Sequence, residues 1–378
     1  MRPLELSRGD VLALRYDAQG LHRAAAEITD LAVLDIGVQD SGPDAAKLAF
    51  DARLTTAPPA HNVGPQQPLA LVWGLRGAPY LHRRSELDDI AAASWPLSDA
   101  DAATRLGETG ARLKKAGRPA LEGFAEGVEL LRTVITEPTA KGAASTAISG
   151  RMSEELGRFC RVCQVVHVSE LIMRLASTPA GIELEPDTSP PVLLPNAGFG
   201  AAAGDVLATQ RLARRYLALL GPATAADVAG YLGARRADIE GCWPDDLRPT
   251  LTDGKAGWLP AETAARLESG KKSAPPPPRG LRLIGAFDPW LQARDRELIV
   301  PDQRLHKALW PVLGRPGVIL GDGEVIGTWR PQSKKLALQL RIEEFVPFSP
   351  SLRRDLDVEA NRVATVRGQQ LTGLQLSS

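Results

Sequence analysis

The sequence predicts an α+β protein in which helical units with short hairpins recur along the chain before a β-rich C-terminal domain. Three observations predict this fold. Residues 211–260 contain three amphipathic helix patterns and a hairpin signal, weaker versions of this pattern lie upstream, and short apolar runs dominate after a proline-rich spacer. A chain of 378 residues exceeds the usual size of one hydrophobic core, so several packed domains are expected.

The first unit is expected at residues 1–84. A capping box at Ser7 and Asp10 begins a helix, a second helix is expected around residues 29–34, and a third follows from Ser41. The apolar segment LALVWGLRGAP then indicates a buried strand. This order of helices and strand predicts a helical unit closed by β-structure.

The second unit is expected at residues 85–184. Capping signals lie in the segments SELD and SDAD near its start. A long helix is expected over residues 153–163. Residues 185–200 are rich in proline and small residues, which indicates an irregular connector to the next unit.

The third unit, with its connector, is expected at residues 185–270 and has the clearest pattern. Thr224 and Asp227 form a capping box between two apolar helix patterns. A basic third helix follows, and Asp253 with Gly254 is a hairpin signal between apolar runs. Three helices followed by a hairpin are the order of a winged helix, so the sequence predicts tandem winged-helix domains, each a helix-turn-helix with a β-wing.

The C-terminal domain is expected at residues 271–378. It opens with the polyproline spacer KKSAPPPPR at residues 271–279. The runs LRLIGAF, RELIV, PGVILG, EVIGTWR and LALQLRI predict short strands of an antiparallel sheet or partly open barrel. A last helix is expected at residues 349–366, and the segment after it is expected either to add a strand or to fray.

The formal net charge is zero, which argues against a polyanion binder that is basic over its whole surface. Any DNA-binding surface must therefore be local. Arginine pairs such as Arg294 with Arg296 are typical of solvated surface. The candidates for DNA contacts are two arginines of the third helix in the winged-helix pattern and three basic residues of a C-terminal hairpin: Arg235, Arg236, Arg330, Lys334 and Lys335.

Composition favours a bacterial cytoplasmic, nucleoid-associated protein, with no membrane-spanning run, no signal peptide and an odd number of cysteines. Cys160, Cys163 and His167 have metal-ligand spacing, but a closed zinc site needs a fourth ligand, which Cys242 supplies only if folding brings it close. We therefore expect buried cysteines on an apolar helix face, and no metal or organic cofactor. P-loop, dinucleotide and Gly-x-Ser-x-Gly motifs are absent from the sequence.

Gln39, Asp40 and Ser41 are the first candidates for chemistry. They precede an expected helix start, where backbone N–H groups and the helix dipole favour anions. A glutamine can both donate to and accept from a water molecule, and an ionised aspartate can polarise that water. Helix capping by Asp40 or Ser41 explains the same residues without catalysis.

Arg76 and His82 are the next candidates. Arg76 leaves the expected buried strand at a position where it could neutralise a phosphate, and Gly77 allows close approach of a backbone. A structural role, in which Arg76 and His82 cap or pair locally, explains them equally well.

Five blocks in order now support a family resemblance: GVQDSGPDAAKLAFDAR, VWGLRGAPYLHRR, YLALLGPATAADVAGYLG, LIGAFDPW and VIGTWRP. Together they resemble the winged-helix DNA-binding family that includes the AlkZ-type DNA glycosylases, over about residues 7–345. The resemblance implies winged helices and a β-rich domain curved around duplex DNA. It also implies monofunctional excision of alkylated bases, including bulky N7-alkylated purines and crosslinked adducts, whose positive charge weakens the glycosidic bond.

The family's catalytic motif is a glutamine, an aliphatic or small residue, and then a glutamine or aspartate. It matches Gly37, Val38 and Gln39 here, so the first polar position has no side chain. Either Gln39 works with Asp40, or the site is weakened, or this chain only binds DNA.

The leading hypothesis is a DNA glycosylase that hydrolyses the N-glycosidic bond of alkylated purines in duplex DNA, for base-excision repair or self-resistance. Gln39 would position the water and Asp40 would assist, and the protein would act as a monomer with no membrane contact. The alternatives are a non-catalytic DNA-binding protein, such as a transcriptional regulator or damage sensor, and a protein–protein interaction role for the winged helices. A regulator would normally be a dimer reading spaced half-sites.

Overall fold

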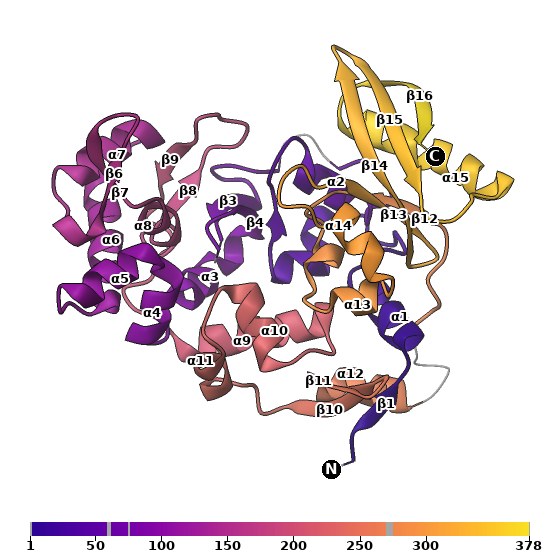
Figure 1. Ribbon diagram of the computed structural model, residues 1–378, viewed down its shortest axis with the longest axis horizontal. Helices are drawn as coiled ribbons and strands as arrows, with labels where there is room; N and C mark the ends of the chain where they lie inside the picture. The colour runs from indigo at the N-terminus through magenta and orange to yellow at the C-terminus, as the bar shows by residue number, and fades with distance from the viewer. Residues whose placement is uncertain (1, 59–61, 75, 270–274, 378) are drawn as a thin grey trace.

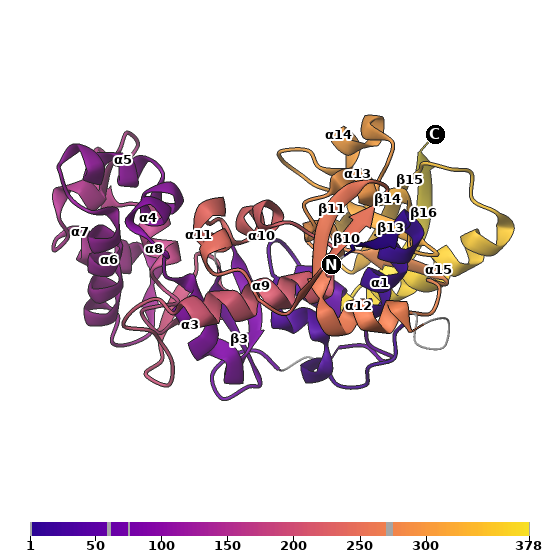
Figure 2. The ribbon, with the colours of Figure 1, turned by 90° about the horizontal axis from the view of Figure 1, so that it is seen from below.

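The computed structural model describes residues 2–58, 62–74, 76–269 and 275–377. Helices and strands are mixed along the whole chain, which confirms the α+β class. Figure 1 shows an elongated molecule with the helices α4–α8 at one end and the sheet that contains β16 at the other. In Figure 2, helix α9 (Val206–Leu220) runs lengthwise between these two ends.

The N-terminal segment builds a small antiparallel sheet in the middle of the molecule, in the strand order β2-β4-β3. The predicted buried strand is confirmed as β3, and the predicted capping box is present at Ser7 and Asp10. The helix expected at residues 29–34 is instead two short 3-10 turns, η1 and η2. The bounds are β1 Leu4–Leu6, α1 Arg8–Ala18, η1 Ile28–Asp30, η2 Ala32–Asp35, β2 Val38–Gln39, α2 Ala45–Asp51, β3 Leu69–Trp73 and β4 Pro79–Arg83.

The second segment is mainly helical. Its elements are η3 Arg84–Glu86, α3 Leu87–Ser94, α4 Asp99–Leu106, α5 Glu108–Lys115, α6 Ala120–Val134, β5 Thr139–Ala140, α7 Lys141–Ser149, η4 Glu154–Leu156, β6 Gly157–Cys160, β7 Val165–Val168, α8 Glu170–Leu175, β8 Ile182–Leu184 and β9 Val192–Pro195. The long helix expected over residues 153–163 was wrong, because that stretch holds one 3-10 turn and the first strand of a hairpin. The connector at 185–200 is only partly irregular, since β9 pairs with β8 and β5.

The third segment has the predicted order of three helices and a hairpin: α9, α10 Ala225–Leu232, α11 Arg236–Gly241, β10 Leu247–Thr252 and β11 Lys255–Pro260, followed by α12 Ala261–Glu268. The capping box of Thr224 and Asp227 is formed, and Asp253 and Gly254 take positive φ angles of 47° and 82° in the hairpin turn. Strand β1 joins the hairpin in parallel beside β10, so the N-terminus completes this sheet.

The C-terminal segment is a five-stranded sheet in the order β12-β13-β14-β15-β16. Its pairs are antiparallel except β15 with β16, which are parallel because helix α15 connects them. The run RELIV was expected to be a strand, but residues 296–299 form a short helix. Residues 271–274 of the proline spacer lie outside the described residues, and 275–279 form neither helix nor strand. The bounds are β12 Leu281–Ile284, η5 Pro289–Gln292, α13 Arg296–Ile299, η6 Gln303–Leu305, α14 His306–Leu309, β13 Gly317–Gly321, β14 Glu324–Lys334, β15 Ala337–Glu344, α15 Pro350–Val366 and β16 Gln370–Ser377.

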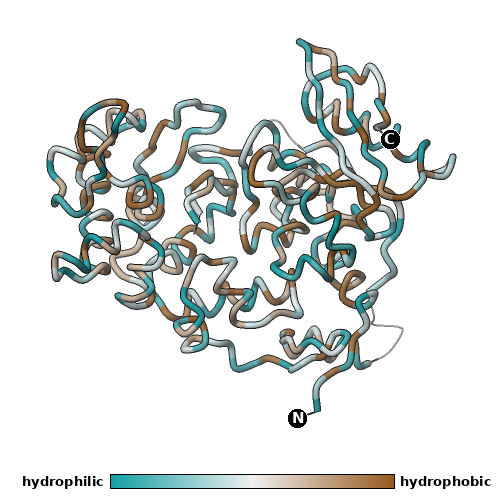
Figure 3. Tube along the Cα trace, in the orientation of Figure 1, coloured by the Kyte–Doolittle hydropathy of each residue, from teal (hydrophilic) through white to brown (hydrophobic). Residues whose placement is uncertain are grey.

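The buried core joins segments that are distant in the sequence. One cluster of apolar side chains extends from Ile28 to Leu193, and a second extends from Leu12 to Leu320. The N-terminal segment contributes to both, so it holds the two ends of the molecule together. Figure 3 shows apolar residues dispersed along the trace, and within the described part of the chain no helix is long and apolar enough to cross a membrane.

Candidate active site

Gln39 lies at the centre of a hydrogen-bonded group of side chains. It ends strand β2 and is only 8% exposed. Its Oε1 accepts from the Tyr80 hydroxyl and from Gln292 Nε2, each at 3.2 Å, and its Nε2 donates to Ser41 Oγ at 2.9 Å. The structure therefore brings together two glutamine amides that are separated by most of the chain.

Arg76 closes this group at the protein surface. Its guanidinium donates to the Tyr80 hydroxyl at 3.1 Å and to Gln292 Oε1 at 3.0 Å. The same guanidinium lies 5.3 Å from the centre of the Tyr231 ring, which is a cation–π contact. Gln39, Tyr80, Arg76 and Gln292 thus form a closed ring of hydrogen bonds, called the Gln39 network below.

Strand pairing places Tyr80 beside Gln39. The two residues are direct partners in the β2–β4 pair, and directly opposed residues of an antiparallel pair project to the same face. Tyr80 is 5% exposed, so its hydroxyl reaches Gln39 from within the fold. The position of this hydroxyl is therefore fixed by the sheet.

A buried ion pair positions Gln292. Arg53 and Asp288 are both fully buried and form two hydrogen bonds of 2.8 Å. Asp288 also accepts from the Trp290 backbone N–H at 2.9 Å, and so caps the short turn η5, which ends at Gln292. Since Arg53 follows helix α2, this pair ties the C-terminal segment to the segment that carries Gln39.

Asp40 lies outside the network. Its Oδ1 accepts from the Ala46 backbone N–H at 3.1 Å, in the first turn of α2, and burial raises the pKa of its carboxyl group. Asp40 is the residue after strand β2, and its side chain turns toward the helix. The residue at the cap position of α2 is Asp44, whose side chain makes no cap hydrogen bond, so Asp40 bonds the first turn of the helix from outside that position.

His82 occupies the space beside Gly37. Gly37 has φ = +78°, and a Cβ atom built on it would lie 2.3 Å from His82 Cε1. His82 is 3% exposed, so its ring is not on the surface that we expected to contact DNA. Burial, with added repulsion from Arg215 and Arg83, lowers the pKa of His82 to about 3, so the ring is neutral at pH 7.

A small apolar pocket adjoins the network and shares Arg76 and Tyr80 with it. Its volume of about 20 Å³ is enough for roughly one water molecule and far too small for a purine base. It is lined by Ile36, Gly74, Arg76, Tyr80, His82, Ile90, Leu212 and Tyr231.

Four arginines gather beside Gln292: Arg76, Arg294, Arg296 and Arg315. Burial, together with repulsion from Arg76 and Arg296, lowers the pKa of both Arg294 and Arg315. Within the described ranges, none of the four forms a salt bridge with a carboxylate. This arginine cluster is a local positive surface in a chain with no net charge, and the sequence had indicated it only in part, through Arg76 as a candidate phosphate contact and Arg294 with Arg296 as a solvated pair.

The two arginines expected on the third helix lie at its start. Arg235 precedes helix α11, and its backbone N–H donates to Asp101 Oδ1 at 2.8 Å. The side chain of Arg236 is 69% exposed and pairs with Glu240 at 2.7 Å. Both are accessible and neither takes part in the Gln39 network, so they are separate candidates for DNA contacts.

The basic residues expected in a C-terminal hairpin lie on β14 and at its end. Arg330 is exposed and donates to the Gly314 carbonyl oxygen at 2.6 Å. Lys334 and Lys335 are exposed at the β14–β15 turn. Arg330 thus contacts the residue before Arg315 and lies beside the arginine cluster, whereas Lys334 and Lys335 lie at the end of β14.

The expectation of buried cysteines on a helix was wrong for two of the three. Cys160 is half-buried at the end of strand β6, and Cys163 is exposed in the β6–β7 turn. Cys242 is buried beside helix α11 in another part of the molecule.

A buried amide, Gln39, bonded to the half-buried amide of Gln292 beside uncompensated arginines is the kind of site expected in an enzyme that acts on a polyanion such as DNA. Comparison with known families agrees. Residues 28–366 match the family described as DNA glycosylase AlkZ-like. The chain therefore belongs to the AlkZ-like DNA glycosylase family, whose members are hydrolases acting on N-glycosyl bonds.

The fold is also similar to a solved structure. The Streptomyces sahachiroi DNA glycosylase AlkZ superposes with a TM-score of 0.73 at 19% sequence identity, over 99% of this chain and 100% of that chain. At this identity the likeness shows a shared fold. No curated protein sequence matches the chain.

Proposed function

We propose that this DNA glycosylase hydrolyses the N-glycosidic bond of N7-alkylated purines in duplex DNA, in base-excision repair or self-resistance. The Gln39 network carries the proposal. Its polar groups are two amides, a phenol and a guanidinium, with no carboxylic acid to protonate a leaving base. An alkylated purine with a positive charge leaves without protonation, so such a site suits that substrate.

In the proposed reaction, a water oxygen attacks the sugar C1′ and the C1′–N9 bond breaks. The bonding electron pair goes to the base and neutralises its positive charge, while the water proton is lost to solvent. Gln39 holds the water, and the amide oxygens of Gln39 and Gln292 direct their negative ends toward the positive charge that develops on the sugar.

Gln292 replaces the amide that Gly37 cannot supply. The motif of the family has a polar residue at this first position, whereas here His82 fills the space next to Gly37. Gln292 Nε2 lies 3.2 Å from Gln39 Oε1, so a second amide lies beside Gln39 and comes from η5. We propose that Asp40 acts by holding the segment between β2 and α2 rather than by contacting the sugar.

The arginine cluster is the proposed phosphate-binding surface nearest to the chemistry. Because the adjoining pocket is too small for a purine, the lesion would meet the Gln39 network from the surface that Arg76 covers. The helices α9–α11 with the β10–β11 hairpin are proposed to act as a winged helix on flanking DNA through Arg235 and Arg236. Arg330, Lys334 and Lys335 would add phosphate contacts.

The unit boundaries at 84, 184 and 270 and the monomeric state remain predictions. Size-exclusion chromatography with light scattering would test the second of these.

The test is a duplex containing one N7-methylguanine, incubated with excess enzyme in single turnover. Release of free base and an abasic site is expected from the wild type. Gln39→Ala and Gln292→Ala should each slow release by about 10²- to 10³-fold. Gln375→Ala, which removes an exposed glutamine of β16, serves as the matched control and should keep the wild-type rate.

DNA affinity is measured in parallel, because loss of binding would imitate loss of catalysis. Undiminished base release by Gln39→Ala would contradict the proposal that Gln39 holds the attacking water. Wild-type binding without release of either small or bulky adducts would favour a binding-only protein.

A further inference from the structure

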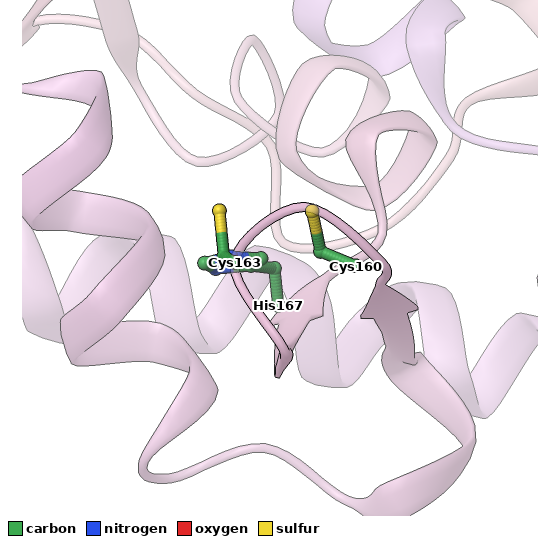
Figure 4. Close-up of side chains that lie close together, drawn as sticks. All are labelled: Cys160, Cys163 and His167. Carbon is green, nitrogen blue, oxygen red and sulfur yellow. The ribbon is translucent and has the colours of Figure 1, made fainter.

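The β6–β7 hairpin carries three metal-ligating side chains in one place. The Cys160 and Cys163 sulfurs and a ring nitrogen of His167 all lie within 4.8 Å of one another. Figure 4 shows both sulfurs pointing the same way from the turn, with the His167 ring beside Cys163. This site is at the end of the molecule formed by α4–α8, in another segment than Gln39, and the proposed reaction does not use it.

The turn between the strands begins at Cys160. The Gln164 backbone N–H donates to the Cys160 carbonyl oxygen at 2.8 Å, and Gln164 takes a left-handed φ of +56°. A cysteine binds metals as the thiolate, and both sulfurs lie on this short turn.

We propose that Cys160, Cys163 and His167 bind one zinc ion, with solvent in the fourth position. Two thiolates and an imidazole are ligands that zinc prefers, whereas calcium and magnesium prefer oxygen. Zinc bonds of about 2.3 Å to sulfur and about 2.0 Å to nitrogen place tetrahedral ligands roughly 3.5–3.8 Å apart. From their present limit of 4.8 Å the three groups need to close by roughly 1.0–1.3 Å at most, which side-chain rotation at an exposed turn provides.

The hairpin itself gives a reason for a metal. Its apolar side chains are poorly covered: Val162 is 91% exposed and Phe159 is 55% exposed. A hairpin that buries so little apolar surface gains little from packing, and an isolated two-stranded hairpin is only marginally stable. Zinc would join the turn to strand β7 through His167 and hold the hairpin together.

The test uses tag-free protein purified with a non-thiol reductant, because a histidine tag would itself bind metal. After dialysis against metal-free buffer, the wild type should retain or take up one zinc ion per chain, measured by elemental analysis. Cobalt(II) added to the apo-protein should give sulfur-to-cobalt charge-transfer absorption and the strong visible bands of a tetrahedral site. Cys160→Ser, Cys163→Ser and His167→Ala should each weaken binding by about 100-fold or more.

Cys242→Ser is the matched control and should bind as the wild type, since Cys242 lies in another segment. Base release from alkylated DNA is not the readout, so this test is independent of the proposed reaction. Absence of thiolate–cobalt absorption in fully reduced protein would overturn the zinc site. Cobalt binding that survives both cysteine substitutions would overturn it too. If the reduced protein takes up no metal but a Cys160–Cys163 disulfide forms in air, the zinc proposal is overturned and the two cysteines are a redox pair.

Discussion

A side chain at position 37 should destabilise the protein, because backbone conformation and His82 both oppose it. An L-residue in the left-handed region costs about 1–2 kcal/mol relative to glycine, and Gly37 has φ = +78°. The Cβ of Gly37→Ala would also lie 2.3 Å from His82 Cε1, and such overpacking in a core costs about 1–3 kcal/mol. The free energy of unfolding should therefore fall by about 2–5 kcal/mol.

Two further variants separate these causes. Gly20 has φ = +69° with nothing within 4 Å of a built Cβ, so Gly20→Ala carries only the conformational cost. In a double-mutant cycle, His82→Ala should recover about 1–3 kcal/mol of the Gly37→Ala loss, because it removes the ring. Urea denaturation followed by circular dichroism gives all the values once two-state unfolding is verified. A Gly37→Ala cost no larger than that of Gly20→Ala would refute the argument.

Three other predictions concern charge. His82 stays neutral in the folded protein, where its pKa is about 3, but it titrates near 6.5 in the unfolded chain. Its contribution to the free energy of unfolding is therefore complete above pH 6.5 and is lost as the pH falls toward 3. Between pH 6 and 4, the free energy of unfolding should fall with pH less steeply in His82→Asn than in the wild type, by about 1.4 kcal/mol per pH unit. Equal slopes of unfolding free energy against pH in the two proteins would contradict this. Arg294→Gln and Arg296→Gln should each reduce the magnitude of the slope of log affinity for duplex DNA against log salt by about 0.9. Arg304→Gln is the control and should leave this slope unchanged, because Arg304 is exposed and paired with Asp302. Asp288→Asn should cost about 3–5 kcal/mol in urea because it strips the partner from fully buried Arg53, and a loss below 1 kcal/mol would show that the pair is dispensable.

Local signals in the sequence predicted the elements that depend on neighbouring residues. The capping boxes at Ser7 and Thr224 fixed two helix starts, because the reciprocal hydrogen bonds involve residues only three apart. Where contacts between distant residues decide between helix and strand, the prediction from the sequence failed. The segment from Ser153 has mixed helix and strand propensity, and its strand β6 forms only because β7 pairs with it.

The candidate active site could be predicted only where it depends on residues close together in the sequence. Gln39 could be found from a short motif, but its second amide comes from Gln292, 253 residues further along the chain. Asp288 stands in a block that the family resemblance had already selected, yet only the fold shows it buried against Arg53. A polar residue two positions after such a block is the signal that could have identified Gln292.

The arginine cluster explains how a chain with no net charge can bind a polyanion. Most arginines in the described residues are neutralised by carboxylates, as Arg211 is by Asp89, so they contribute little to the field outside the protein. Within the described ranges Arg76, Arg294, Arg296 and Arg315 have no such partner, and repulsion from Arg76 and Arg296 opposes the charge of Arg294 and Arg315. A phosphate that binds there relieves this repulsion and gains its own attraction to the cluster. Net charge is therefore a poor guide to DNA binding in this protein. Whether each arginine is paired with a carboxylate is a better guide. The proposed phosphate surface borders Gln292, so binding and chemistry would meet at the same few residues.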